Sequence, residues 1–218
     1  MSNILNRWLH YLGLEPQLAH WYAFPARFGK IAFFWSEDQN RGAMLLRIII
    51  SQQEIDGLSQ GFGKKESSLP RELAPFYDFI HGLFDTGRDT VGGHEPEANA
   101  VCGDGAARFV FPLDQIPLHL CPDFQRRTLA QEHRTPPGTV TTYARLAAAC
   151  GQPRGARAVA VSLSHNPFPL LIPCHRTVRS DGSLGGYQGG LAMKRWLLEQ
   201  EGVPFLKSGR TDLNCLSF

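Results

Sequence analysis

The sequence lacks long apolar runs, paired cysteine motifs and any large excess of charge. No stretch approaches the roughly 20 apolar residues that a membrane-spanning helix needs, and the opening "MSNILNRWLHYLGLEP" holds no continuous apolar segment typical of a signal peptide. We therefore expect neither membrane insertion nor secretion. The chain has 218 residues, of which 43% are hydrophobic, enough for one large domain or two small ones with a real core in each.

The cysteines are few, odd in number and scattered. No C-x-x-C pair occurs, which argues against a paired zinc knuckle and against a thioredoxin-like redox motif. Reduced thiols in an intracellular compartment are the simplest interpretation of this pattern. The five cysteines are Cys102, Cys121, Cys150, Cys174 and Cys215.

Acidic residues are absent from one long stretch. The net charge of the chain is only +2, but residues 134–180 contain six arginines, no lysine and no aspartate or glutamate. This segment therefore carries +6 and the rest of the chain −4. A local basic block is typical of a polyanion contact, although a solvated surface would give the same composition.

The first half of the chain predicts a small α+β domain of about a hundred residues without recognisable chemistry. Residues 1–12 have an amphipathic pattern ended by a glycine, and apolar residues at helical spacing between Leu73 and Phe84 predict another helix. Two β-rich runs, 30–35 and 43–50, predict a hairpin. The remaining expectations are a loop over 85–106, a strand over 107–113 and a linker over 114–123.

The second half predicts short helices joined by tight turns. A helix is expected over 122–133, a second over 143–150 with Thr142 as its cap, and a third over 156–164. The intervening "GQPRG" makes the last two a candidate helix-turn-helix, a weak signal by itself because most such pairs are structural. Arg157 is the only long charged side chain at the front of the third helix, where a solubilising role is the common alternative.

The stretch "HNPFPLLIPCHR" places Cys174 directly before His175. The prolines and the apolar "LLI" predict an extended, buried strand that ends at Cys174, so adjacent side chains should point to opposite sides. A direct Cys174–His175 hydrogen bond is then disfavoured, and a bridging water is the natural link. From the residues alone, a nucleophile, a zinc ligand and a small buried side chain remain open for Cys174, although the spacing supports zinc poorly.

Three motifs together resemble one family. These are "PCHR" after the apolar run, the glycine-rich "GSLGGYQGGLAMKRWLLEQEG" and the upstream "GTVTTYARLA". They are similar to the C-terminal domain of O6-alkylguanine-DNA alkyltransferases (methylated-DNA–protein-cysteine methyltransferases), and the resemblance runs from about Phe124 to Gly202. It is much weaker over residues 1–121.

The resemblance implies direct repair of DNA in one irreversible turnover. The thiolate of Cys174 takes the alkyl group from O6 of guanine, with O4 of thymine as a further position. A water between Cys174 and His175 takes the proton, Glu201 holds His175 from its far side, and Tyr143 donates toward guanine N3. From the residues alone, Glu201 could equally be a solvated carboxylate and Tyr143 a packing residue.

The resemblance also implies that the target base is flipped out of the duplex through the minor groove. Arg157 fills the gap, Asn166 is a hinge between the DNA-reading helix and the active-site strand, and the carbonyls of Cys174 and Thr177 read the base. Ser164 departs from the family's usual basic residue. The DNA contacts implied are Arg154, Gly155, Ala156, Arg157 and Ala158, and the substrate contacts are Asn166, Thr177, Tyr187, Gln188 (through its N–H), Gly189 and Lys194.

The fold implied is α+β with two domains. Residues 1–115 form an RNase H-like α/β domain, and residues 122–206 form a mainly helical domain with a winged helix-turn-helix-like motif. No cofactor and no metal are expected. The partner implied is double-stranded DNA containing O6-alkylguanine, and no membrane partner is expected. The protein should act as a monomer. Its expected location is the cytoplasm, in association with the nucleoid, or the nucleus if the source is eukaryotic.

Two other classes of function compete with this interpretation. Alkyltransferase-like proteins bind the lesion without chemistry and replace the cysteine, so the presence of Cys174 argues against that class. A cysteine hydrolase is disfavoured because Cys174 and His175 are adjacent, whereas the partner histidine of such enzymes usually comes from elsewhere in the chain.

Overall fold

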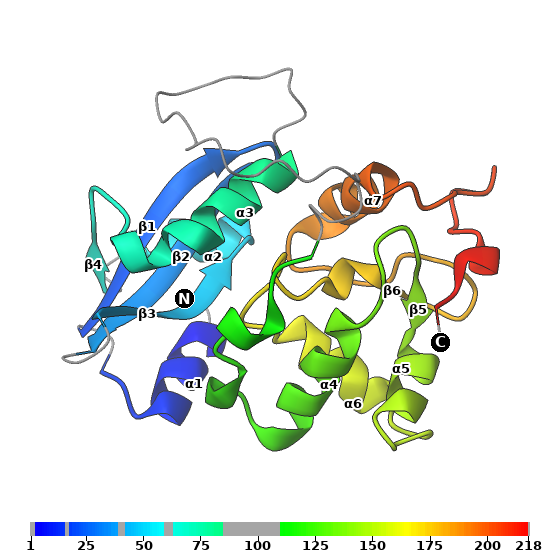
Figure 1. Ribbon diagram of the computed structural model, residues 1–218, viewed down its shortest axis with the longest axis horizontal. Helices are drawn as coiled ribbons and strands as arrows, with labels where there is room; N and C mark the ends of the chain where they lie inside the picture. Colours follow the sequence, from blue (N-terminus) through cyan, green and yellow to red (C-terminus); the bar gives the residue numbers. More distant parts are fainter. Residues whose placement is uncertain (1–2, 16–17, 39–41, 59–62, 85–109, 218) are drawn as a thin grey trace.

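The computed structural model describes residues 3–15, 18–38, 42–58, 63–84 and 110–217. Within these ranges, no helix is both long enough and apolar enough to cross a bilayer. The chain forms a mixed, mostly antiparallel sheet with helices in its first part and a group of short helices in its second (Figure 1). This mixed α/β architecture agrees with the fold class expected from the sequence.

The first part is organised by one sheet with strand order β3-β2-β1-β4. Its central strand β2 buries Phe33 on one face and Phe34 on the other, as the two-residue period of a strand requires. Helix α3 covers the first face, and α2 with part of α1 covers the second (Figure 1). The elements are α1 (Asn3–Leu12), β1 (Ala19–Ala26), β2 (Gly29–Asp38), β3 (Gly42–Ile49), α2 (Gln52–Leu58), β4 (Lys64–Lys65), η2 (Arg71–Leu73) and α3 (Ala74–Phe84).

The second part is mainly helical, with one pair of very short parallel strands. Helix α5 begins where the Thr142 side chain accepts a hydrogen bond from the Arg145 amide, 3.2 Å away, as expected for this cap. Gly151, with a φ of +73°, follows the end of α5 and lets the chain turn toward α6. The elements are η4 (Leu113–Gln115), η5 (Leu118–Leu120), α4 (Asp123–His133), β5 (Thr141–Thr142), α5 (Tyr143–Ala149), α6 (Ala156–Ser164), η6 (Cys174–Arg176), β6 (Thr177–Val178), α7 (Gly190–Gln200) and η7 (Leu213–Cys215).

One hydrophobic cluster runs through both parts of the chain. It joins the α3 face of the sheet to buried residues of α4, α5, α6 and α7, and it includes Cys174. The Ile48 amide of β3 also donates to the Pro167 carbonyl at 2.8 Å, directly beside the segment that leads to Cys174. The sheet therefore supports the back of the segment that carries the candidate nucleophile.

Several sequence expectations need correction. The sequence predicted only two strands between residues 19 and 50, whereas β1 adds a third that pairs with β2. The described part of the strand expected over 107–113 is irregular and leads into η4, and residues 107–109 and the loop expected over 85–106 lie outside the described ranges. The linker expected over 114–123 holds η5 and packs Ile116 and Cys121 into the core.

The apolar run before Cys174 is a turn and not a strand. Leu170 has a φ of +74°, a left-handed conformation that is rare for a residue other than glycine. An isolated bridge between Pro169 and Ile172 closes this turn. Cys174 then begins a single 3-10 turn, so the alternation expected of an extended chain does not apply to Cys174 and His175.

Candidate active site

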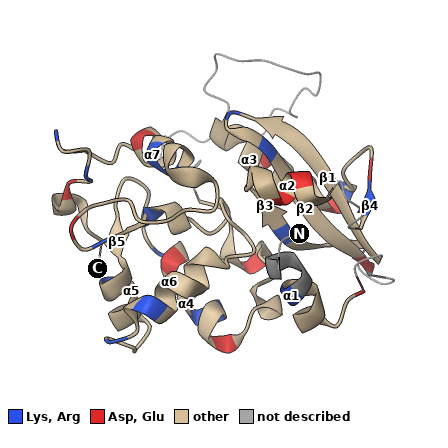
Figure 2. Ribbon diagram, turned by 180° about the vertical axis from the view of Figure 1, so that it is seen from behind, with Lys and Arg blue, Asp and Glu red and all other residues tan. Residues whose placement is uncertain are grey.

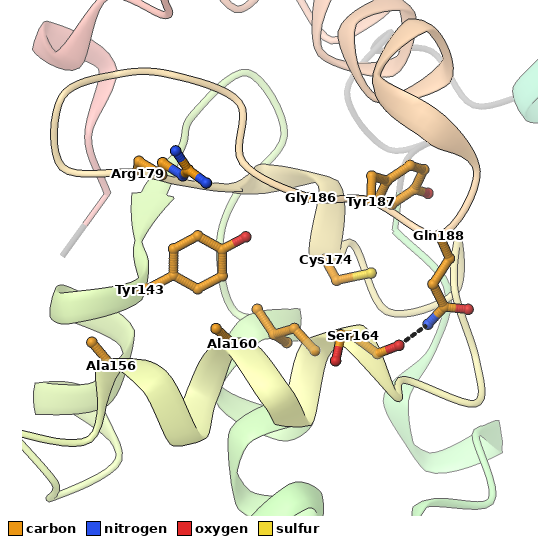
Figure 3. Close-up of a pocket in the computed structure, with 10 residues that line it drawn as sticks. Tyr143, Ala156, Ala160, Ser164, Cys174, Arg179, Gly186, Tyr187 and Gln188 are labelled. Atoms are coloured by element: carbon orange, nitrogen blue, oxygen red, sulfur yellow. Dashed lines mark hydrogen bonds between the residues drawn. The ribbon is translucent and has the colours of Figure 1, made fainter. Parts of the chain in front are cut away.

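Cys174 lies at a cavity of about 600 Å³, within the range of small-molecule sites (Figure 3). The cavity opens beside α6, which contributes one wall, while the loop before α7 contributes the opposite wall. The sulfur is therefore not enclosed by apolar side chains alone. The lining residues are Tyr143, Ala156, Ala160, Leu163, Ser164, Cys174, Arg179, Gly186, Tyr187 and Gln188.

The Cys174 thiol is buried, with 6% of the residue exposed. Burial raises the pKa of Cys174 to about 11, although a hydrogen bond from Asn166 Nδ2 to Sγ, at 3.3 Å, favours the thiolate. At neutral pH the sulfur therefore carries its proton, and any nucleophilic role needs a group that removes it.

Asn166 is fully buried and ties three segments together. Its Nδ2 also donates to the Ile172 carbonyl at 3.4 Å, and its Oδ1 accepts from the Phe168 amide at 3.0 Å. It links the end of α6 to the turn before Cys174, as expected of a hinge. Asn166, which the sequence suggested as a substrate contact, is not among the residues that line the cavity.

His175, Arg176 and Glu201 form a buried charged cluster behind the sulfur. His175 Nε2 donates to Glu201 Oε1 at 2.8 Å, and Arg176 donates to both carboxylate oxygens at 2.8–3.1 Å. Burial opposes the carboxylate, but His175 and Arg176 outweigh it and lower the pKa of Glu201 to about 2. Burial lowers the pKa of His175, so its ring is neutral at pH 7. Because Nε2 holds the ring proton, Nδ1 is free to accept one, and among the described residues it has no partner.

Arg176 corrects the interpretation of the basic block. It is 1% exposed and neutralised by Glu201, so it adds nothing to the surface charge. The other five arginines of residues 134–180 are exposed, and Figure 2 marks basic residues beside α5 and α6. Their positions are Arg134, Arg145, Arg154, Arg157 and Arg179.

Helix α6 presents two faces. Four of its residues line the cavity, as the list above gives, whereas Arg157 and Ala158 are exposed and are not among the lining residues. Gly155, before the helix, is partly buried, and Arg154 in the turn is exposed. Of the DNA contacts expected from the sequence, only Ala156 lines the cavity, and the others lie on the adjoining surface.

Lys194 and Thr177, which the sequence suggested as substrate contacts, are not among the residues that line the cavity. Lys194 is fully buried on α7, and its Nζ donates to the carbonyls of Thr177, at 2.7 Å, Leu184, at 2.5 Å, and Gly186, at 3.4 Å. The Thr177 carbonyl is thus already engaged by Lys194. Lys194 holds the strand after Cys174 against the loop that forms the far wall of the cavity.

The glycine-rich loop places Tyr187 and Gln188 over the cavity. Gly185 has a φ of +69°, and a Cβ there would lie 3.0 Å from Tyr143 Oη, so only glycine fits comfortably. The Gln188 side chain donates to the carbonyls of Ser164, at 3.1 Å, and Asn166, at 3.0 Å, and closes the cavity toward α6 (Figure 3). Gly189 packs against Met193 instead of lining the cavity.

Sequence reasoning missed two residues near the sulfur. Arg179 lines the cavity but was counted only as part of the basic block. Glu132 lies in a helix of polar composition, so nothing in the sequence indicated that its carboxyl is fully buried. Across the described ranges, no three His, Cys, Asp or Glu side chains gather in a way that could hold a metal ion.

Comparisons with known proteins agree on one family. Residues 123–203 match the model for the 6-O-methylguanine DNA methyltransferase, DNA binding domain. A methylated-DNA–protein-cysteine methyltransferase of Methanothermobacter thermautotrophicus is 51% identical over 94 residues, covering 43% of this chain and 52% of that protein. The human protein of the same name is 41% identical over 117 residues, 53% of each chain. This chain spans about half the length of the curated relatives it matches.

Solved structures extend the likeness to most of the chain. The DNA-bound crystal structure of the Mycobacterium tuberculosis protein OGT superposes with a TM-score of 0.55 at 24% identity, covering 84% of this chain and 92% of that one. An O6-methylguanine-DNA methyltransferase from Pyrococcus kodakaraensis gives 0.53 at 21% identity, covering 85% and 99%. These structural similarities show a common fold. The sequence matches show which proteins with that fold are similar to this chain in sequence. Residues 123–203 of this chain are therefore similar in sequence to the DNA-binding domain of the 6-O-methylguanine DNA methyltransferases.

Proposed function

We propose that this protein repairs alkylated DNA by moving an alkyl group from O6 of guanine, or from O4 of thymine, to Cys174. One observation carries the proposal: the Cys174 sulfur lies at a cavity of about 600 Å³, large enough to admit a purine base, and one wall of this cavity is α6, the helix expected to meet DNA. The thioether product is stable, and no described group could regenerate the thiol, so each molecule acts once. The reaction needs no cofactor.

The proton leaves Cys174 through His175. A water between Sγ and the free Nδ1 of His175 would take the thiol proton, and Glu201 stabilises the imidazolium from the Nε2 side. The thiolate then attacks the alkyl carbon, the carbon–O6 bond breaks, and its electrons pass to the guanine. Tyr143, whose pKa is raised by burial, keeps its proton at pH 7 and donates it toward N3 of the leaving base.

The DNA contacts follow from the exposed face of α6. Residues 143–164 act as a helix-turn-helix that enters the minor groove, where the small side chains of Gly155, Ala156 and Ala158 permit close approach. Arg157 replaces the flipped base in the stack. Exposed arginines around this face, among them Arg154, would supply phosphate contacts that Ser164 cannot make.

Base recognition rests on main-chain groups around the cavity. The Gln188 N–H and the Cys174 carbonyl are candidates for hydrogen bonds to the base. The Thr177 carbonyl already accepts a hydrogen bond from Lys194, so it would have to accept a second one from the base. Residues 122–206 form the DNA-binding and acceptor domain, and residues 1–115 form an RNase H-like domain that supports it. The protein acts as a monomer on double-stranded DNA, in the nucleoid or the nucleus.

The decisive experiment is a mass measurement. Incubation with a duplex containing O6-methylguanine should add one methyl group to the peptide that contains Cys174 and to no other cysteine peptide. The Cys174→Ala variant should bind the same duplex without transfer. Methylation at Cys102, Cys121, Cys150 or Cys215, or loss of DNA binding together with transfer, would overturn the assignment. Binding without any transfer by the unchanged protein would favour a lesion-binding module.

A further inference from the structure

A second buried carboxyl interacts electrostatically with the candidate nucleophile. Glu132, on α4, is 0% exposed, and its Oε2 accepts a hydrogen bond from Thr177 Oγ1 at 2.5 Å. Its Oε1 has no partner among the described residues. Thr177 directly follows the turn that carries Cys174, so Glu132 is anchored to the same segment as the sulfur.

The buried charges around Glu132 divide into two groups. Arg176 and Glu201 form a closed pair that sums to zero. Lys194, by contrast, donates only to backbone carbonyls, and no described carboxylate lies within ion-pair distance of its Nζ. Its positive charge is therefore balanced at longer range, and the two ionisable acids that could balance it are Glu132 and Cys174.

We propose that Glu132 is a positioning residue that governs the ionisation of Cys174: as a carboxylate it balances Lys194 and holds Cys174 as a thiol, and when protonated it leaves Lys194 to stabilise the thiolate. The proposal rests on the proposed function only in taking Cys174 as the nucleophile. No bond to Glu132 forms or breaks apart from that to its proton, which exchanges with solvent.

The electrostatic interactions support this reciprocal effect. Burial raises the pKa of Glu132 to about 7, although Thr177, Arg176 and Lys194 each favour its carboxylate and Glu201 opposes it. The Glu132 carboxylate in turn raises the pKa of Cys174, while Lys194 lowers it. Burial lowers the pKa of Lys194 to about 8, and both acids act to keep it charged.

Other groups interact electrostatically with Glu132, but they do not cancel its effect on the ionisation of Cys174. Its carboxylate also raises the pKa of Tyr143 and of Cys150, both on or next to α5. Neither residue ionises at neutral pH, because burial is the largest cause of the raised pKa in both. Lys194 and Cys174 are therefore the partners through which Glu132 acts between pH 6 and 9.

The test measures Cys174 ionisation without DNA. The folded full-length protein is treated with iodoacetamide between pH 5.5 and 9.5, and alkylation of the Cys174 peptide is followed by mass spectrometry. The rate of Cys174 alkylation in Glu132→Gln is divided by the rate in the unchanged protein. This ratio should be close to one below pH 6 and should rise through pH 7. A ratio on the order of tenfold near pH 7.5, where Lys194 still carries its charge, corresponds to a difference of one unit in the pKa of Cys174.

Two further variants separate charge from packing. Thr177→Val removes the hydroxyl that stabilises the carboxylate, so Glu132 should stay protonated to higher pH, and Cys174 should react faster than in the unchanged protein near pH 8. Glu199→Gln removes an exposed carboxylate from α7 and should leave the profile unchanged. If Glu132→Gln fails to fold, Thr177→Val alone decides.

Parallel profiles for the unchanged protein and the folded Glu132 and Thr177 variants would overturn the proposal. A uniform change at every pH would mean that Glu132 only packs, and it would overturn the proposal equally. Failure of the proposed function would give a different result. The alkylation ratio would still depend on pH as expected, but no methyl group would be transferred from DNA.

Discussion

Glu201→Gln tests whether the buried cluster behind Cys174 is an electrostatic unit. The carboxylate receives one N–H from His175 and three contacts from Arg176, and all three side chains are at most 3% exposed. Glutamine retains the shape but cannot neutralise Arg176. Removing one member of a buried ion pair typically costs about 3–5 kcal/mol, because the remaining charge is left uncompensated.

The pH dependence gives an independent magnitude. The pKa of Glu201 is about 2 in the folded chain, against about 4.5 for an unperturbed carboxyl. A depressed carboxyl pKa stabilises the fold above the unfolded value, and that stability is lost as pH falls through the folded value. The difference corresponds to about 3 kcal/mol, which agrees with the ion-pair cost. Unfolding free energies of the two proteins should therefore differ most above pH 5 and converge toward pH 2.

Urea unfolding at pH 7, 4 and 3 measures this difference directly. Glu199→Gln is the matched control, since Glu199 pairs with Arg195 one turn away on the surface of the same helix. Its loss should cost less than about 0.5 kcal/mol. A cost below about 1 kcal/mol for Glu201→Gln at pH 7, or a cost independent of pH, would refute the assigned role of the cluster.

The remaining predictions concern transfer itself. Tyr143→Phe should slow transfer by about a hundredfold or more, since it removes a proton donor, with unfolding unchanged; unaltered rates would exclude Tyr143 as that donor. Arg157→Ala should slow repair of duplex DNA far more than reaction with a free alkylguanine base, and equal slowing would refute its role in flipping. Gln188→Ala should raise the rate for benzyl relative to methyl substrates several-fold, because the side chain closes the cavity toward α6; an unchanged ratio would contradict this.

The helices near the cavity were predictable because their signals are local. Thr142 caps α5, the "GQPRG" turn separates α5 from α6, and α6 keeps a helical apolar pattern from start to finish. Strand β1 was missed because its exposure alternates imperfectly and it contains Pro25 near its end. The apolar run 170–172 was interpreted as a strand because hydrophobicity indicates that a segment is buried but not which backbone conformation it adopts.

The charged residues of the site were least predictable because their partners are distant in sequence. Arg176 meets Glu201 after 25 residues, and Thr177 meets Glu132 after 45. Sequence alone placed Arg176 in a basic surface and gave Glu132 no role, since neither burial nor long-range pairing follows from composition. The resemblance supplied the contact between His175 and Glu201, which no spacing rule implies.

The charged residues of this half of the chain fall into an exposed group and a buried group, which respond differently to salt. The exposed arginines around α5 and α6 face solvent, where salt at physiological strength screens them beyond about 8 Å. Glu132, Lys194 and Glu201 have almost no exposed side-chain surface, so salt reaches their interactions with Cys174 only weakly. Added salt should therefore weaken association with duplex DNA steeply while leaving the ionisation of the thiol almost unchanged. Under the proposed function, affinity for DNA and reactivity of the sulfur would thus vary independently, because different residues in different dielectric surroundings set them.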